Sequence, residues 1–286
     1  MIDNDHSPLP GTEVHYLRSE HVGDEFKVLV GLGGEDRPAT RPVLFMGDAW
    51  ANFGTAVEIV QLLRFTEVVP DLLIIAVGYR TTDMAEIEDL RCRDFTATVD
   101  HDSHHPNTAM MAGAGRFLAF LRDELKPWVR DRYGADPDDS MLFGYSLGGL
   151  FATYVLLNEP AVFRRYGIGS PALNWDKKLM FAQEERYANA HRDLPAKVVF
   201  SVGEYENPAG YRRFLEQLPP DKRAAEEDTI DDDDYAADVE RMVAVLRGRA
   251  YPSLELDHEV FPGEYHETAP PLALSRSLRY LFGAPR

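Results

Sequence analysis

The apolar residues of this chain gather in short runs that alternate with segments of helical spacing. The runs at 43–46 and 72–77 are uninterrupted, as expected of strands buried on both faces, and residues 197–202 and 254–261 are also strand-like. Between the first two runs, residues 56–65 carry apolar side chains at helical spacing. Strands that alternate with helices in this way predict a mainly parallel central sheet with helices on both faces.

The N-terminal part of the chain adds an antiparallel hairpin to this pattern. Residues 14–17 and 26–30 are short strand-like runs with Gly23 and Asp24 between them. Farther along, apolar side chains at i, i+4, i+8 and i+11 predict one face of a long helix: Phe117, Leu121, Leu125 and Trp128. With a terminal helix near 272–281 and no repeat or linker, we expect a single α/β domain over 1–286.

Two polar stretches interrupt the alternation. Residues 94–112 contain three histidines, and residues 207–236 are rich in Pro, Glu and Asp. Both follow predicted strands on the side of an open α/β sheet where loops line the active crevice. Long loops at that edge are often functional, so we predict that both act as lids.

The overall charge and the cysteine content exclude several functions. Among the 286 residues, 30 Lys and Arg oppose 48 Asp and Glu, which gives a net charge of −18. Nucleic acid and anionic membrane surfaces reward basic residues, so neither is an expected partner. No apolar run approaches the ~20 residues that span a bilayer, and the acidic N-terminus is unlike a secretory signal. Since Cys92 is the only cysteine, nothing requires an oxidising compartment and we expect a cytoplasmic protein.

The sequence Gly144-Tyr145-Ser146-Leu147-Gly148 is the strongest chemical signal in the chain. It follows the apolar end of a predicted strand and precedes an apolar helical segment. A strand-to-helix turn this tight needs glycine neighbours, and it lifts the serine hydroxyl out of the sheet. This arrangement is typical of the nucleophile elbow of α/β-hydrolases, with Ser146 as nucleophile.

A serine nucleophile needs a base, and in this fold the acid and then the histidine follow it in the chain. His191 precedes any suitable acid and His258 lies within a predicted strand, so we predict that His266 is the base. Glu206 and Glu204 both follow the strand ending at Val202. We favour Glu206 because it lies deeper in the turn, with Glu204 as the alternative and Asp176 as a weaker candidate.

The oxyanion of the tetrahedral intermediate needs backbone donors. We predict that the N–H groups of Leu147 and Asp48 form this hole, and that the Asp48 carboxylate points away from it. Arg91 and Arg93 are candidates for binding an anionic or carbonyl-bearing substrate. Candidates for an apolar or aromatic pocket are Phe95, Tyr145 and Trp175.

Two clusters have residue types that bind metals. Residues 100–105 contain aspartates and histidines, and residues 231–234 are four aspartates. Neither cluster has a recognised ligand spacing. We therefore predict no metal site and no cofactor.

Over most of its length, from about residue 13 onward, the chain resembles the bacterial putative-esterase family of α/β-hydrolases. This group includes siderophore trilactone esterases and, more distantly, esterase D. The resemblance is carried by six segments: 143–152 (FGYSLGGLFA), 170–176 (SPALNWD), 91–96 (RCRDFT), 203–206 (GEYE), 261–267 (FPGEYHE) and 278–283 (LRYLFG). It implies the same roles for Ser146, Glu206 and His266.

The chain departs from the family pattern at one position beside the predicted oxyanion hole. Where the family usually has Leu-Asp-Gly-Asp, this chain has Phe45-Met46-Gly47-Asp48, which makes the surroundings more apolar. The acidic stretch 225–234 would repel an anionic ferric tris-catecholate.

Together these features predict a serine esterase that hydrolyses a small-molecule ester or lactone through an acyl-enzyme. An acyltransferase that uses the same acyl-enzyme is an alternative. A non-catalytic binding protein with this fold is a third reading, which an unreactive Ser146 would favour.

Overall fold

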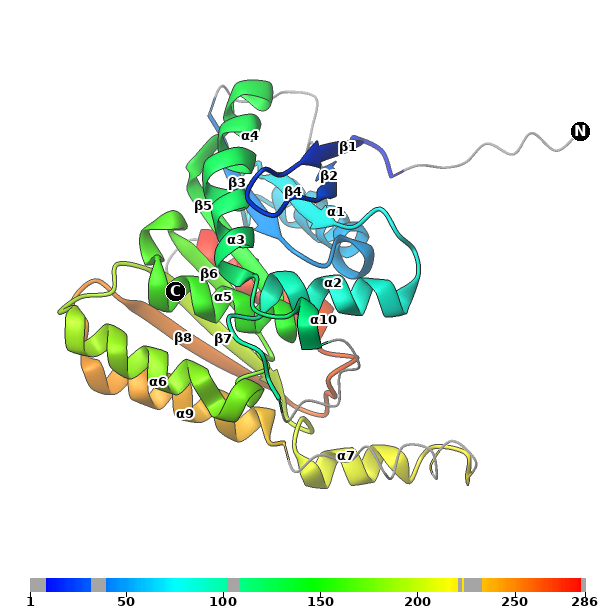
Figure 1. The fold of residues 1–286 in the computed structure, drawn as a ribbon, viewed down its shortest axis with the longest axis vertical. Helices are drawn as coiled ribbons and strands as arrows, with labels where there is room; N and C mark the ends of the chain where they lie inside the picture. Colours follow the sequence, from blue (N-terminus) through cyan, green and yellow to red (C-terminus); the bar gives the residue numbers. More distant parts are fainter. Residues whose placement is uncertain (1–8, 32–39, 102–107, 221–222, 224–232, 284–286) are drawn as a thin grey trace, which may run out of the picture.

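The computed structural model describes residues 9–31, 40–101, 108–220, 223 and 233–283. Eight strands in this part of the chain form one sheet, in the order β1-β2-β4-β3-β5-β6-β7-β8 (Figure 1). The strands are β1 (Thr12–Arg18), β2 (Glu25–Gly31), β3 (Pro42–Met46), β4 (Leu73–Gly78), β5 (Asp136–Tyr145), β6 (Arg165–Gly169), β7 (Lys197–Gly203) and β8 (Glu255–Phe261). β2 pairs antiparallel with β1 and β4, and all other pairings are parallel. The predicted parallel sheet with an N-terminal hairpin is confirmed.

Helices cover both faces of the sheet (Figure 1). They are α1 (Ala49–Phe65), α2 (Met84–Phe95), α3 (Ala114–Ala119), α4 (Lys126–Tyr133), α5 (Leu147–Asn158), α6 (Trp175–Ala190), α7 (Pro208–Leu215), α9 (Tyr235–Arg249) and α10 (Pro270–Phe282), with short 3₁₀ turns η1 (Thr108–Met110) and η3 (Pro160–Val162). α1 and α10 pack on one face, whereas α2–α6 and α9 pack on the other. None of the described helices is long and apolar enough to cross a bilayer.

The side chains of β7 show how the sheet divides the core in two. Val198, Phe200 and Val202 point into the larger apolar cluster, and Val199 points into the cluster under α1 and α10. Successive side chains of a strand face opposite sides, so a strand with a helix layer on each side must be apolar on both. This requirement explains the apolar runs in the sequence.

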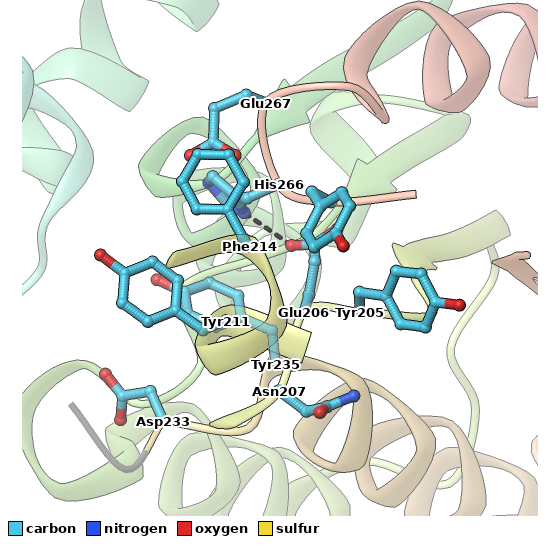
Figure 2. A pocket seen from close by; sticks show the side chains of 10 residues that line it. Tyr205, Glu206, Asn207, Tyr211, Phe214, Asp233, Tyr235, His266 and Glu267 are labelled. Carbon is cyan, nitrogen blue, oxygen red and sulfur yellow. Dashed lines mark hydrogen bonds and ion pairs between the residues drawn. The ribbon is translucent and has the colours of Figure 1, made fainter. Parts of the chain in front are cut away.

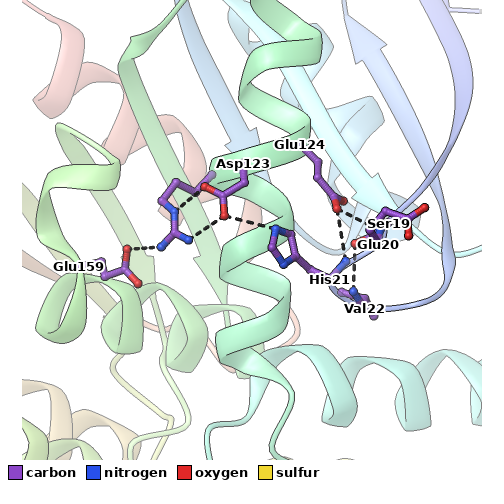
Figure 3. Close-up of polar contacts among 8 residues, drawn as sticks. Ser19, Glu20, His21, Val22, Asp123, Glu124 and Glu159 are labelled. Carbon is purple, nitrogen blue, oxygen red and sulfur yellow. Dashed lines mark hydrogen bonds and ion pairs between the residues drawn. The ribbon is translucent and has the colours of Figure 1, made fainter.

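The predicted long helix around 117–128 exists, but its middle is wound differently. Residues Phe120–Leu125 form a π-helical segment, η2, between α3 and α4. Polar contacts join this segment to the turn of the β1–β2 hairpin (Figure 3). The Glu124 carboxylate accepts the backbone N–H groups of Glu20 (2.9 Å) and His21 (3.3 Å), and Asp123 contacts the His21 ring at 3.3 Å.

Replacing Glu124 by alanine is expected to destabilise the fold by about 1–2 kcal/mol, because two hairpin amides lose a charged acceptor. Chemical denaturation of the purified variant measures this change. Glu240→Ala, at an exposed position of α9, should stay within about 0.5 kcal/mol of wild type. Equal stability of the two variants would show that the hairpin turn is held by other contacts.

The two predicted lid stretches are described only in part. Of 94–112, residues 102–107 lie outside the described residues, as does most of the histidine cluster. Of 207–236, residues 208–215 form α7, and residues 221–222 and 224–232 lie outside the described residues. The last aspartate of the acidic run, Asp234, caps α9 by accepting the Ala237 N–H at 2.8 Å. The lid function of both stretches stays a prediction.

Candidate active site

Ser146 lies at the sharp turn between β5 and α5. Its backbone has φ 57° and ψ −120°, a conformation that costs a non-glycine residue free energy. The turn needs its glycines: a Cβ on Gly144 would collide with the Gly148 carbonyl, and one on Gly149 would lie 2.7 Å from the Gly169 oxygen. The sequence therefore folds locally into the elbow that the G-x-S-x-G spacing predicts.

The structure brings Ser146, His266 and Glu206 into one hydrogen-bonded row. His266 Nε2 lies 3.0 Å from Ser146 Oγ, and His266 Nδ1 lies 2.6 Å from Glu206 Oε2. The three residues follow β5, β8 and β7, whose C-terminal ends meet at one edge of the sheet. The histidine is thus placed to exchange a proton with the serine while the carboxylate fixes its tautomer.

Three donors hold the Glu206 carboxylate at Oε1, the oxygen that does not face His266. Its side chain is buried, and Oε1 accepts from Ser170 Oγ at 2.6 Å and from the Gly203 N–H at 2.7 Å. Tyr145 Oη adds a longer contact of 3.3 Å to the same oxygen. These bonds orient the carboxylate so that Oε2 faces His266.

The other candidate acids and bases lie elsewhere. Glu204 Oε2 accepts the Gly263 N–H at 2.8 Å, in the turn after β8. His258 lies within β8, and His191 follows the last residue of α6. Asp176 lies in the irregular first turn of α6, where its N–H contacts Asp100. The geometry favours Glu206 and His266.

Tyr145 fastens the loop that carries His266. Its hydroxyl donates to the His266 carbonyl at 2.7 Å, and its ring centroid lies 5.1 Å from that of the imidazole. Burial, followed by the nearby Glu206 carboxylate, raises the pKa of the Tyr145 phenol above its ordinary value, so that it remains a donor. The structure gives the tyrosine a contact with the base, whereas the sequence suggested one with substrate; substrate binding by Tyr145 stays a prediction.

Tyr145→Phe is expected to lower kcat about tenfold with little change in KM, because the His266 loop loses one anchoring hydrogen bond. Steady-state kinetics on a simple ester measures the two constants. Tyr154→Phe, on α5, serves as the control for loss of a hydroxyl. A rise in KM at constant kcat would instead assign Tyr145 to substrate binding.

The predicted oxyanion donors lie at two helix N-termini. Leu147 is the first residue of α5, and Asp48 immediately precedes α1 with φ 50° and ψ 44°. Backbone N–H groups at the start of a helix have no acceptor within that helix, and the helix dipole there favours negative charge. The two termini adjoin, since a Cβ on Gly148 would lie 3.2 Å from Asp48 Oδ2. This placement is consistent with an oxyanion hole, which stays a prediction.

Both candidate arginines bind carboxylates of the protein itself. Arg91 pairs with Asp48 and Glu88, and Arg93 pairs with Asp94 (2.8 Å) and Asp24 (2.6 Å). For each arginine, burial lowers the pKa, but the neighbouring carboxylates outweigh it and raise the pKa above its ordinary value. Both guanidinium groups therefore stay charged and engaged away from the pocket described next.

The remaining pocket candidates pack into the interior. Phe95 is buried against Phe117 and Phe151, and a Cβ on Gly47 would lie 2.7 Å from its ring. Trp175, at the start of α6, packs against the main apolar cluster. The Phe95 ring therefore packs against Gly47, the residue before Asp48. Substrate contact by Phe95 or Trp175 stays a prediction.

A pocket of about 270 Å³ opens beside His266 (Figure 2). Its wall is mostly aromatic, and the lining residues are Tyr205, Glu206, Asn207, Tyr211, Phe214, Asp233, Tyr235, Tyr265, His266 and Glu267. The Tyr235 ring contacts the imidazole of His266, with 5.2 Å between centroids. These aromatic residues were missed from sequence; the available signal was Tyr211 and Phe214, three residues apart just after the candidate acid.

The fold and this row of residues define an α/β-hydrolase. The family model described as "Putative esterase" matches residues 19–238, and the chain belongs to this family. One relative is the ferri-bacillibactin esterase BesA of Bacillus subtilis, 27% identical over 284 residues, which covers 95% of this chain and 90% of the relative.

Solved structures agree on the fold. The BES protein of Bacillus cereus superposes with a TM-score of 0.80 at 24% identity, over 99% of both chains. The siderophore hydrolase EstB of Aspergillus nidulans gives a TM-score of 0.79 at 19% identity, over 98% of this chain and 99% of the other. The predicted fold class is confirmed, and the family supports an esterase.

Proposed function

We propose that this protein is a serine carboxylic-ester hydrolase that works through an acyl-enzyme. The observation that carries this proposal is the hydrogen-bonded row Ser146–His266–Glu206, with distances of 3.0 and 2.6 Å. Each partner has the position that proton transfer from a serine hydroxyl requires.

In the first half of the reaction, Ser146 Oγ attacks the ester carbonyl carbon while His266 Nε2 takes the serine proton. The carbonyl π electrons move to oxygen, and the N–H groups of Leu147 and Asp48 stabilise the resulting oxyanion. When the intermediate collapses, the bond to the alcohol oxygen breaks and His266 returns the proton to that oxygen. Glu206 stabilises the imidazolium throughout.

Water completes the cycle on the acyl-enzyme. His266 accepts a proton from water as the water oxygen attacks the acyl carbon. When the second intermediate collapses, the bond between the acyl carbon and Ser146 Oγ breaks, His266 returns the proton to Oγ, and the carboxylic acid leaves. No group beyond these side chains and amides takes part in the steps.

The pocket beside His266 supports a substrate with aromatic or apolar groups. Its aromatic wall offers stacking surfaces, and its 270 Å³ volume suits one ring or a short acyl chain better than a whole siderophore. The acidic stretch 225–234 disfavours an anionic ferric tris-catecholate, but relatives include a ferri-bacillibactin esterase and siderophore hydrolases. On the strength of these relatives we propose siderophore lactones and esters as the natural class, and comparing the iron-free with the ferric substrate tests the effect of the charge. Only part of such a molecule would enter the pocket.

The decisive experiment is hydrolysis of a p-nitrophenyl ester chain-length series and of a catecholate trilactone, iron-free and ferric, with products identified by mass. We expect ester turnover and stepwise opening of the lactone ring by water. Added acceptor alcohols distinguish hydrolysis from acyl transfer. Absence of turnover on every ester, together with no labelling of Ser146 by a fluorophosphonate, would contradict the proposal and favour a binding protein.

A further inference from the structure

A buried carboxylate stands beside the proposed oxyanion hole. The side chain of Asp48 is 7% exposed and that of Arg91 is 11% exposed. Arg91 Nε donates to Asp48 Oδ1 at 2.7 Å and Nη2 donates to Oδ2 at 3.2 Å, which is a two-pronged pair. The remaining nitrogen, Nη1, donates to both oxygens of Glu88 at 2.8 Å.

The position of this carboxylate matters because of what adjoins it. Asp48 Oδ2 lies 3.2 Å from the place a Cβ on Gly148 would occupy, and Gly148 follows Leu147, a proposed oxyanion donor. The backbone N–H of Asp48 itself is the other donor. An aspartate before a helix usually caps it, but this carboxylate makes no such bond to α1. Its side chain is turned to Arg91 instead.

We infer that Arg91 is a positioning residue for ester hydrolysis, which offsets the Asp48 charge and holds its carboxylate away from the oxyanion. This inference rests on the proposed function and deepens it. Without the guanidinium, a negative charge would stand beside the developing negative charge of the transition state, where the low dielectric strengthens repulsion. The ground state carries no oxyanion, so the effect falls on kcat.

The helix that carries Arg91, α2, also packs against the loop before Asp48. Arg91 lies one helical turn before Phe95, and Phe95 packs under Gly47. One helix thus supplies both the packing beneath the loop and the charge beside it. The bonds to Asp48 and Glu88 use four of the five N–H donors of Arg91, which leaves one N–H on Nη2 for any other partner.

Four variants test the inference with a short p-nitrophenyl ester as substrate. Arg91→Met keeps an apolar stem and removes the charge, and we expect kcat to fall about 100-fold with KM within about threefold of wild type. Arg91→Lys keeps the charge and should lose less. Asp48→Asn/Arg91→Met removes both charges and should regain at least about tenfold in kcat. Arg249→Met, which leaves the buried Glu184 without its two-pronged partner, controls for an unpaired buried carboxylate and should keep the wild-type kcat.

The outcomes separate charge compensation from other roles. A fall in kcat that the double variant does not relieve would overturn the inference, as would a folded Arg91→Met with wild-type kcat. A higher KM at unchanged kcat would assign Arg91 to the substrate instead. If Arg91→Met alone does not fold, the double variant, which leaves neither charge of the Asp48–Arg91 pair buried alone, is compared with wild type. A kcat within about tenfold of wild type supports the inference, and a fall of about 100-fold or more overturns it. Wild type no faster than Ser146→Ala would overturn the proposed function and this role with it.

Discussion

Ser146→Ala should abolish ester hydrolysis, with kcat falling on the order of 10⁶-fold, because the variant has no nucleophile to form the acyl-enzyme. The oxyanion donors and the pocket stay in place, so KM should change little. Steady-state kinetics on p-nitrophenyl esters measures both constants, and a fluorophosphonate probe should label only the wild type.

Ser140→Ala provides the matched control. Ser140 is buried in the middle of β5, the strand that leads into the elbow, so its loss tests whether removing a buried hydroxyl alone affects turnover. We expect this variant to keep the wild-type kcat. Activity in Ser146→Ala above about one-hundredth of wild type would mean that another group attacks the ester.

Glu206→Gln should lower kcat by about 10⁴-fold, because a neutral amide cannot stabilise the imidazolium and can hold the wrong histidine tautomer. Glutamine fills the same space and can still accept from Ser170 and Gly203, which bond to Oε1 in the native protein. The fold should therefore survive, and thermal unfolding checks that it does. Kinetics of the folded variant then report the loss of charge.

Glu204→Gln tests the alternative acid that the sequence left open. Glu204 Oε2 bonds to the Gly263 N–H rather than to His266, so we expect kcat within about threefold of wild type. If Glu204→Gln were the more damaging of the two substitutions, the acid would have to be reassigned.

Local patterns predicted the fold and the elbow well. The apolar runs and the hairpin correspond to strands of the sheet, and the G-x-S-x-G spacing lies at a turn where Gly144 is sterically required. Such features depend on residues close together in the chain, so propensity and spacing are sufficient to predict them. The choice of His266 and Glu206 used the order of elements in this fold, and the structure places His266 beside Ser146 and Glu206 beside His266.

Contacts between distant segments were not predictable in the same way. The aromatic pocket wall joins residues near 205–214, 233–235 and 265–267, which meet only after the sheet forms. The sequence makes Arg91 a candidate for substrate binding, but it does not reveal that Asp48, 43 positions away, accepts a hydrogen bond from it. The π-helical turn in the long helix also had no signature in the apolar spacing.

The backbone of Ser146 has a consequence for the whole molecule. A non-glycine residue at φ 57° and ψ −120° costs on the order of 1–3 kcal/mol, and the folded protein carries that cost whether or not substrate is present. Glycine is the residue this backbone favours, and it is also the residue that removes the nucleophile. Selection for thermal stability and selection for catalysis therefore oppose each other at this one position. The serine is retained only where selection for catalysis is the stronger of the two.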